Sequence, residues 1–297
     1  MDLTRTAPGP AAHTMTSALV LGGGGPLGIA WQAGLLTGLT RRGLDPARAD
    51  LVLGTSAGSI VGAALTAGLD LTTLADQVGG QLPIPPDSDG GITGLMELTA
   101  QTTSPARTIE RVTGYALAAD TLPEADYLDT PLFATFEGVP WPAGFHCTTI
   151  DIDTGRLQVW DAAAGAPLAP ALAASCAVPG LFPPVTIAEH RHIDGGMLSP
   201  LNAELAAGHP HIVIVSCFAL TPPGASPGPA EAAARQLTEI DRLRTGGSEV
   251  TCIEPGQEFL AISNWGADIM STTHAAQAYE AGLRQADTAA LPPSQTT

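Results

Sequence analysis

The sequence predicts a single α/β domain built around a parallel β-sheet. "SALVLGGGG" (17–25) is typical of a buried strand that ends in a glycine run, residues 27–43 carry apolar side chains at helical spacing, and "LVL" (51–53) is typical of a second short strand. A strand, a helix and a strand at this spacing favour a parallel βαβ unit. Hydrophobic residues make up 44% and charged residues 14% of the 297 residues, which indicates a globular chain.

The first half of the chain continues from this unit. The helix over 27–43 is expected to end at Gly43, because glycine commonly follows the last residue of a helix. A second helix is expected directly after Ser56. The turn-rich segment "PIPPDSDGGITG" (83–94) is not expected to form regular structure. Residues 95–135 are expected to be mostly helical, and residues 80–135 are a candidate lid over a site.

The second half of the chain alternates strands and helices. "FHCTTIDIDTGRLQVW" (145–160) contains two strand-like runs joined by Asp-Thr-Gly and predicts a hairpin. The further elements are expected in this order: a helix over 167–175, strands over 190–194 and 211–218, a flexible loop over 222–230, a helix over 231–247, a strand over 248–255 and a helix over 274–286. We expect residues 17–286 to form the one domain, between flexible tails at 1–16 and 287–297.

The charge of the chain limits its partners. The net charge is −17, and all 12 cationic residues are arginines. This charge excludes nucleic acid as an expected partner, and it weakens attraction to anionic lipid surfaces, where each basic residue contributes about 1 kcal/mol. The sequence has neither a signal-peptide pattern nor a run of about 18 apolar residues, so we expect a cytoplasmic protein with at most peripheral membrane contact. The four cysteines, Cys147, Cys176, Cys217 and Cys252, are expected to be buried free thiols.

The glycine run "GGGGPLG" (22–28) predicts an anion site. It ends a strand and opens a helix, so its backbone N–H groups and the helix dipole favour a phosphate or an oxyanion. Gly23 to Gly28 also matches G-x-G-x-x-G, a dinucleotide fingerprint that needs an acidic residue about 20 positions later. Asp45 and Asp50 fall near that offset. A non-catalytic or nucleotide-binding α/β protein is therefore an alternative, although it leaves the next motif unexplained.

Ser56 is the candidate nucleophile. It lies in "DLVLGTSAGSIVGAAL" (50–65), after a strand and before a helix, within the pattern G-x-S-x-G. A nucleophile at a sharp strand-to-helix turn needs small neighbours, which Gly54, Ala57 and Gly58 supply. A serine that only caps the helix would fit the same position, but would not require these small neighbours.

A serine nucleophile needs a positioned proton acceptor. Asp194 comes directly from the strand "RHI" and is followed by Gly195 and Gly196, which let another segment approach closely. A second D-G-G at 89–91 lies in a loop whose composition already accounts for it. Asp194 is therefore the preferred base, and a Ser-His-Asp esterase that uses His274 is the alternative.

Two other groups of polar residues have simpler explanations. Asp151 and Asp153 suggest a metal loop, but they lack the later ligands of a calcium loop, so a hairpin turn is preferred. His190 and His192 alternate with Arg191 on a strand that is expected to be exposed.

Taken together, four blocks resemble the patatin-like phospholipase family. These are "GGGGPLG" (22–28), "GTSAG" (54–58), "ASCAVPGLFPPV" (174–185) and "DGG" (194–196), in that order, within a similarity that extends over roughly residues 17–286. The resemblance implies a three-layer α/β/α sandwich with a mostly parallel central sheet. It also implies a serine acyl hydrolase of lipids or other acyl esters that forms an acyl-enzyme and needs no cofactor or metal ion.

The resemblance further implies a role for each site residue. Ser56 is the nucleophile and Asp194 accepts its proton, while the amides of Gly23, Gly24 and Gly25, together with that of Ala57, hold the oxyanion. Two positions depart from the family pattern. Leu27 stands where many members carry Arg or Lys, and "MLSPLN" places Pro200 before Asn202, whereas the family often has an Asn and a Pro soon after D-G-G.

Overall fold

The computed structural model describes residues 17–79, 95, 104–224 and 227–289. In this part of the chain, eight strands form one sheet in the order β5-β6-β3-β2-β1-β7-β8, with β4 paired to β3. The strands are β1 (Ser17–Leu21), β2 (Leu51–Thr55), β3 (Phe145–Asp151), β4 (Leu157–Trp160), β5 (Val185–Ile187), β6 (His190–Asp194), β7 (His211–Val215) and β8 (Glu249–Ile253).

The sheet is parallel across β3, β2, β1, β7 and β8, and antiparallel where β4, β5 and β6 join it. β1 and β2 are short, mostly apolar and almost completely buried strands that lie inside the sheet, as expected for a parallel sheet covered on both faces. The α-helices are α1 (Gly25–Arg41), α2 (Ala57–Thr66), α3 (Thr72–Val78), α5 (Pro105–Ala118), α6 (Glu124–Leu128), α7 (Pro131–Ala134), α8 (Leu168–Ser175), α9 (Pro227–Thr245), α10 (Gln257–Ile262) and α11 (Ala275–Gln285).

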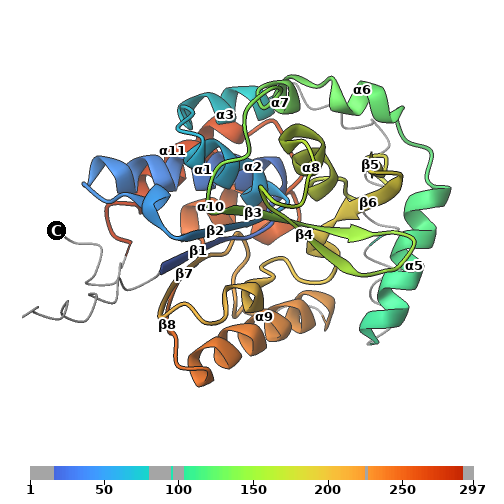
Figure 1. Ribbon diagram of the computed structural model, residues 1–297. Coiled ribbons are helices and arrows are strands. Elements are labelled where there is room, and N and C mark those ends of the chain that lie inside the picture. Colours follow the sequence, from blue (N-terminus) through green and yellow to red (C-terminus); the bar gives the residue numbers. More distant parts are fainter. Residues whose placement is uncertain (1–16, 80–94, 96–103, 225–226, 290–297) are drawn as a thin grey trace, which may run out of the picture.

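Helices cover both faces of the sheet (Figure 1). The larger core lies between one face and helices that include α1, α2, α8 and α11. A smaller core lies between the other face, α9 and the short 3-10 helix η3 (Ala203–Ala206). The predicted three-layer α/β/α sandwich with a mostly parallel central sheet is therefore confirmed.

The predicted elements are present with small shifts. α1 begins at Gly25, two residues before the predicted start, and Gly43 follows it with a left-handed φ of 86°. The hairpin over 145–160 is formed by β3 and β4. The sequence patterns did not predict α3, α10 and β5, all of which have seven residues or fewer.

Some predictions fall partly or wholly on residues that the structure does not describe. The tail at 1–16, the segment 83–94 and most of the C-terminal tail lie outside the described residues. Of the candidate lid, the described residues form α5, α6 and α7 and agree with the predicted helices. Among the described residues, no helix has both the length and the apolar composition needed to cross a lipid bilayer.

Candidate active site

The carboxyl ends of β2 and β6 meet along β3. β4 occupies one edge of β3, so β2 and β6 share the other edge. β2 runs parallel to β3 and its last residue, Thr55, pairs with Thr148. β6 runs antiparallel to β3 and its last residue, Asp194, pairs with Thr149. Because Ser56 follows Thr55, the sheet itself places Ser56 beside Asp194.

Ser56 lies in a strained turn between β2 and α2. Its φ of 52° and ψ of −118° lie outside the regions that residues with a side chain normally adopt. A Cβ on Gly58 would lie 2.0 Å from the carbonyl oxygen of Leu21, and a Cβ on Gly54 would lie 2.5 Å from that of Gly58. The two glycines therefore allow α2 to pass close to β1 and β2, the geometry that a nucleophile elbow requires.

Two buried hydrogen bonds hold this turn in place. The amide N–H of Ser56 donates to Oγ of Ser175, the last residue of α8, at 3.0 Å. Oγ of Ser59 donates to the carbonyl oxygen of Ser56 at 2.6 Å. The backbone of Ser56 is thus fixed from both sides, and its side chain stays free to react.

Asp194 is a buried carboxylic acid beside that side chain. Its Oδ1 accepts the amide hydrogen of Gly196 at 2.7 Å. Burial raises the pKa of Asp194 from 3.8 to about 7, and its interactions with the Ser56 side chain and the Gly196 amide lower the pKa by less. A pKa near the operating pH suits a general base, so this pair can activate a hydroxyl without histidine.

Asn202 links the residue before Ser56 to the residue after Asp194, a role that the sequence patterns did not predict. Its side-chain amide lies within 3.3 Å of Oγ1 of Thr55, Oγ1 of Thr148 and the carbonyl oxygen of Gly195, and donates to the Ser199 carbonyl at 2.9 Å. Asn202 has a left-handed backbone, with φ 49° and ψ 33°, which asparagine tolerates better than most residues. The departure "MLSPLN" therefore supplies a buried amide that connects the end of β2 to the D-G-G turn.

The predicted oxyanion donors divide into two groups. The prediction of Gly23 as an oxyanion donor is wrong in this structure, because its amide N–H already donates to the carbonyl oxygen of Pro200 at 2.8 Å. Within the described residues, no acceptor takes the amide hydrogens of Gly24, Gly25 and Ala57. α1 begins at Gly25 and α2 at Ala57, so both helix dipoles favour negative charge here. These three amides are the candidate oxyanion donors.

A small pocket opens onto Ser56. Its volume is about 30 Å³, which is room for a water molecule but not for an acyl chain. Side chains from α6 and α7, inside the candidate lid, form part of its wall. The pocket is lined by Gly25, Pro26, Ile29, Ser56, Ala57, Tyr127, Leu132, Phe133, Cys176, Val178, Phe182 and Met270.

Cys176 is a second nucleophilic group in the pocket. Burial raises its pKa well above the ordinary value, which keeps it a thiol and a weak nucleophile. All four cysteines are free, as predicted, but only Cys147 and Cys217 are buried, while Cys176 and Cys252 are half-buried.

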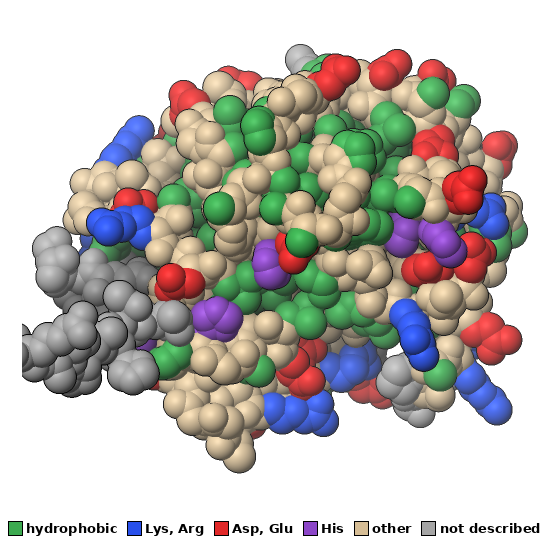
Figure 2. All heavy atoms as spheres, in the orientation of Figure 1, with side chains coloured by type: hydrophobic (Ala, Val, Ile, Leu, Met, Phe, Trp, Pro, Cys, Tyr) green, Lys and Arg blue, Asp and Glu red, His purple; other side chains and the backbone are tan. Residues whose placement is uncertain are grey.

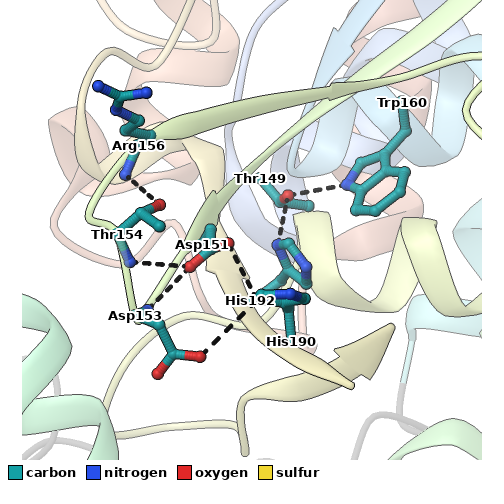
Figure 3. Close-up of polar contacts among 8 residues, drawn as sticks. All are labelled: Thr149, Asp151, Asp153, Thr154, Arg156, Trp160, His190 and His192. Atoms are coloured by element: carbon teal, nitrogen blue, oxygen red, sulfur yellow. Dashed lines mark hydrogen bonds and ion pairs between the residues drawn. The ribbon is translucent and has the colours of Figure 1, made fainter. Parts of the chain in front are cut away.

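Asp151 and Asp153 form the turn between β3 and β4 (Figure 3). Oδ1 of Asp151 accepts the amide hydrogens of Asp153 and Thr154 at 2.8 and 2.9 Å, which is the turn that the sequence predicts. Nδ1 of His190 lies 3.5 Å from Oδ2 of Asp151 and 3.8 Å from Oδ2 of Asp153. These three side chains could offer ligand atoms to a metal ion, but they lie at the opposite end of β6 from Asp194.

His192 corrects another expectation. The strand was expected to expose both His190 and His192, but His192 is only 3% exposed. Nδ1 of His192 lies 3.2 Å from Oγ1 of Thr149, which also accepts a hydrogen bond from Nε1 of Trp160 at 2.8 Å (Figure 3). Burial lowers the pKa of His192, so it favours the neutral form and anchors the strand that ends at Asp194.

The residues of the alternative predictions lie elsewhere. Asp50 directly precedes β2 and accepts the amide N–H of Ser17, at the opposite end of the sheet from the glycine run. It cannot bind a ribose there as the dinucleotide fingerprint requires. His274 is an exposed residue just before α11, and it does not line the pocket at Ser56. Asp89 lies outside the described residues.

Comparisons with known proteins give a family and distant structural neighbours. No curated protein matches the chain significantly. VipD from Legionella pneumophila is 14% identical with a TM-score of 0.44, and the match covers 93% of this chain and 67% of that chain. ExoU from Pseudomonas aeruginosa, solved with SpcU, is 17% identical with a TM-score of 0.37, and the match covers 92% and 53%. The chain thus spans about two thirds of the first protein and about half of the second.

The family match contains all of the predicted site residues. A family model described as "Patatin-like phospholipase" matches residues 19–207, which is more than half of the 297 residues. This range contains the glycine run, the turn at Ser56, the helix that ends at Ser175 and the D-G-G turn at Asp194. The chain belongs to the patatin-like phospholipase family.

Proposed function

We propose that this protein is a serine acyl hydrolase that cleaves carboxylic ester bonds of lipids with a Ser56–Asp194 dyad. One observation supports this most: a buried carboxyl group with a pKa of about 7 lies beside a serine in a strained strand-to-helix turn and interacts with its side chain. A structural cap would need neither the strain nor the buried acid.

The reaction has two halves. Asp194 takes the hydroxyl proton of Ser56 as Oγ attacks the ester carbonyl carbon, and the alcohol leaves with a proton returned by Asp194. Water then attacks the acyl-enzyme and gives one proton to Asp194, which returns it to Oγ of Ser56 as the acyl–Oγ bond breaks and the fatty acid leaves. The same carboxyl group therefore serves as base and acid in each half.

The oxyanion of each half forms next to two helix N-termini. The amides of Gly24, Gly25 and Ala57 are the proposed donors, and Gly23 is excluded because Pro200 already occupies its N–H. Loss of one such donor typically costs about 2.7–4 kcal/mol in the transition state. Pro26, which has no N–H, lies beside these donors in the pocket wall and cannot add another.

The first experiment is labelling with a fluorophosphonate probe, followed by mass spectrometry of the modified peptide. We expect modification at Ser56, none in Ser56→Ala, and at least about tenfold slower labelling in Asp194→Asn, because general-base catalysis contributes about 10²–10⁴-fold. His274→Ala is the matched control and should label at the rate of the unchanged protein.

Two outcomes would contradict the proposal. Labelling at another residue would remove Ser56 from the mechanism. Full labelling and ester turnover in Asp194→Asn, with loss of both in His274→Ala, would favour the histidine triad instead.

A further inference from the structure

Trp265 is an exposed aromatic side chain with an unusual backbone. It lies in the loop of residues 263–270 between α10 and α11, which we call the Trp265 loop. Its exposure is 50%, the highest among the large hydrophobic residues that the structure describes, whereas Trp31 and Trp160 are buried. Tryptophan is highly buried on average, and it is enriched at surfaces that meet a partner or a membrane interface.

The backbone at Trp265 and at the residue before it is left-handed. Trp265 has φ 54° and ψ 31°, and Asn264 before it has φ 48°. Left-handed geometry at a bulky residue is an outlier that typically costs of the order of 1 kcal/mol or more and needs support from its surroundings. The support is a set of backbone hydrogen bonds, in which Gly266 and Asp268 donate to Ser263 and Ala267 donates to Asn264.

The same loop reaches the active-site pocket. The amide of Leu27 in α1 donates to the carbonyl oxygen of Ile269 at 3.4 Å. Met270 lines the pocket together with Gly25 and Ser56. The loop that carries Trp265 therefore continues directly into the wall of the pocket at Ser56.

The charge around the loop selects the kind of surface. The sequence has no lysine or arginine between Glu254 and Arg284. Glu258 and Glu280 pair with Arg284, and Asp268, in the loop itself, has no ion-pair partner among the described residues. The loop therefore lacks the clustered basic residues on which attraction to anionic membranes depends. Tryptophan favours the headgroup region of a bilayer without needing charge, since it has an apolar body and a polar N–H.

We infer that the Trp265 loop docks on a zwitterionic phospholipid surface and places the active-site pocket against it. The inference rests on the proposed function and names the physical form in which that site meets its lipid. The strain at Trp265, its exposure and the contact of Met270 with the pocket then share one explanation.

The test separates docking from catalysis. The inactive variant Ser56→Ala is mixed with phosphatidylcholine vesicles, and the bound fraction and tryptophan emission are measured. We expect Ser56→Ala to bind with a blue-shifted emission. In Ser56→Ala/Trp265→Ala the partition coefficient should fall by at least about tenfold, because half of a large aromatic side chain no longer enters the interface. Ser56→Ala/Leu205→Ala is the matched control and should bind like Ser56→Ala, because Leu205 is 39% exposed but lies on the η3 side of the sheet.

A second measurement uses the active protein. The ratio of vesicle hydrolysis to hydrolysis of a dissolved short-chain ester should fall in Trp265→Ala and stay constant in Leu205→Ala. Equal vesicle binding with and without Trp265 would overturn the inference, as would a Trp265-dependent dimer that does not bind vesicles. Trp265-dependent binding without any ester hydrolysis would overturn the proposed function and leave the docking surface intact.

Discussion

Ser56 lies at the centre of the candidate site, and its backbone conformation is energetically unfavourable and lowers the stability of the fold. Strain of this kind typically costs about 1–3 kcal/mol and persists only where the surroundings enforce it. Here Ser175 and Ser59 bind the backbone on both sides, and the absence of side chains at Gly54 and Gly58 lets α2 pack closely against β1 and β2.

This strain predicts a difference between two inactive variants. Ser56→Gly and Ser56→Ala both lack the hydroxyl, but only glycine adopts φ 52° without steric cost. After allowing about 0.5–1 kcal/mol for the greater flexibility of unfolded glycine, we expect Ser56→Gly to be about 1 kcal/mol more stable than Ser56→Ala. Urea unfolding measures the difference. Equal stability would mean that the turn relaxes around alanine.

Asp194 sets the pH dependence of the proposed reaction. It must be ionised to accept a proton, and its pKa is about 7 because the side chain is buried. We expect kcat/KM for an uncharged dissolved ester to rise about tenfold per pH unit below 7 and to level off above it. A rate that is already constant at pH 5 would mean that another group, or a solvated Asp194, acts as the base.

Asp194 also makes stability depend on pH, but stability should fall as the pH rises, whereas activity should increase. The folded pKa of about 7 lies above the ordinary 3.8, so the folded protein binds more protons than the unfolded chain in between. The contribution of Asp194 to stability is full below the lower value and is lost as the pH rises through 7. Relative to Asp194→Asn, whose amide does not titrate, the unchanged protein should lose about 4 kcal/mol between pH 4 and pH 8. A constant difference in unfolding free energy would contradict the burial argument.

At the scale of elements, α1 and α11 pack in very close contact. A Cβ on Gly34 would lie 2.0 Å from the carbonyl oxygen of Tyr279, and a Cβ on Gly282 would lie 2.1 Å from that of Trp31. The glycines let the two backbones approach each other, and α1 carries the candidate oxyanion amides at its N-terminus. The position of this helix pair therefore affects the site.

Substitution of Gly34 by alanine should force the two helices apart. Alanine favours a helix over glycine by about 1 kcal/mol, yet the clash is with backbone and should produce a net loss of about 1–3 kcal/mol. Gly114→Ala in α5 is the control, because a Cβ there meets nothing within 4 Å and only the favourable propensity remains. Thermal unfolding of both variants tests the contrast. A stabilised Gly34→Ala would show that α11 shifts at little cost.

The sequence predicted the elements with strong local patterns and missed what depends on the assembled sheet. Apolar runs and glycine motifs gave β1, α1, β2 and the turn at Ser56. Gly23 was misjudged because its acceptor, Pro200, is distant in sequence, and His192 was misjudged because β3 and Trp160 bury it. Asn202 carried no signal beyond its displaced motif, since its four acceptors meet only when β2, β3 and the D-G-G turn are in place.

At the scale of the whole molecule, acidic side chains outnumber basic ones by 29 to 12. On the face drawn in Figure 2, acidic side chains are spread around the rim, and hydrophobic side chains are visible near the centre. The arginine ion pairs of the described residues, such as Arg242 with Glu204 and Arg284 with Glu258, have exposed partners and contribute little each. Repulsion among like charges is therefore the dominant long-range term.

This balance predicts that salt stabilises the fold. The Debye length falls from about 30 Å at 0.01 M salt to about 8 Å at 0.15 M, and a net charge of −17 makes the compact state more repulsive than the expanded chain when screening is weak. We expect Tm to rise when sodium chloride is increased over this range at pH 8, where the carboxyl groups are ionised. A fall in Tm would mean that the surface ion pairs outweigh the repulsion. Repeating the titration with Arg284→Gln, which removes the two-bonded pair with Glu258 and makes the net charge more negative, should steepen the rise.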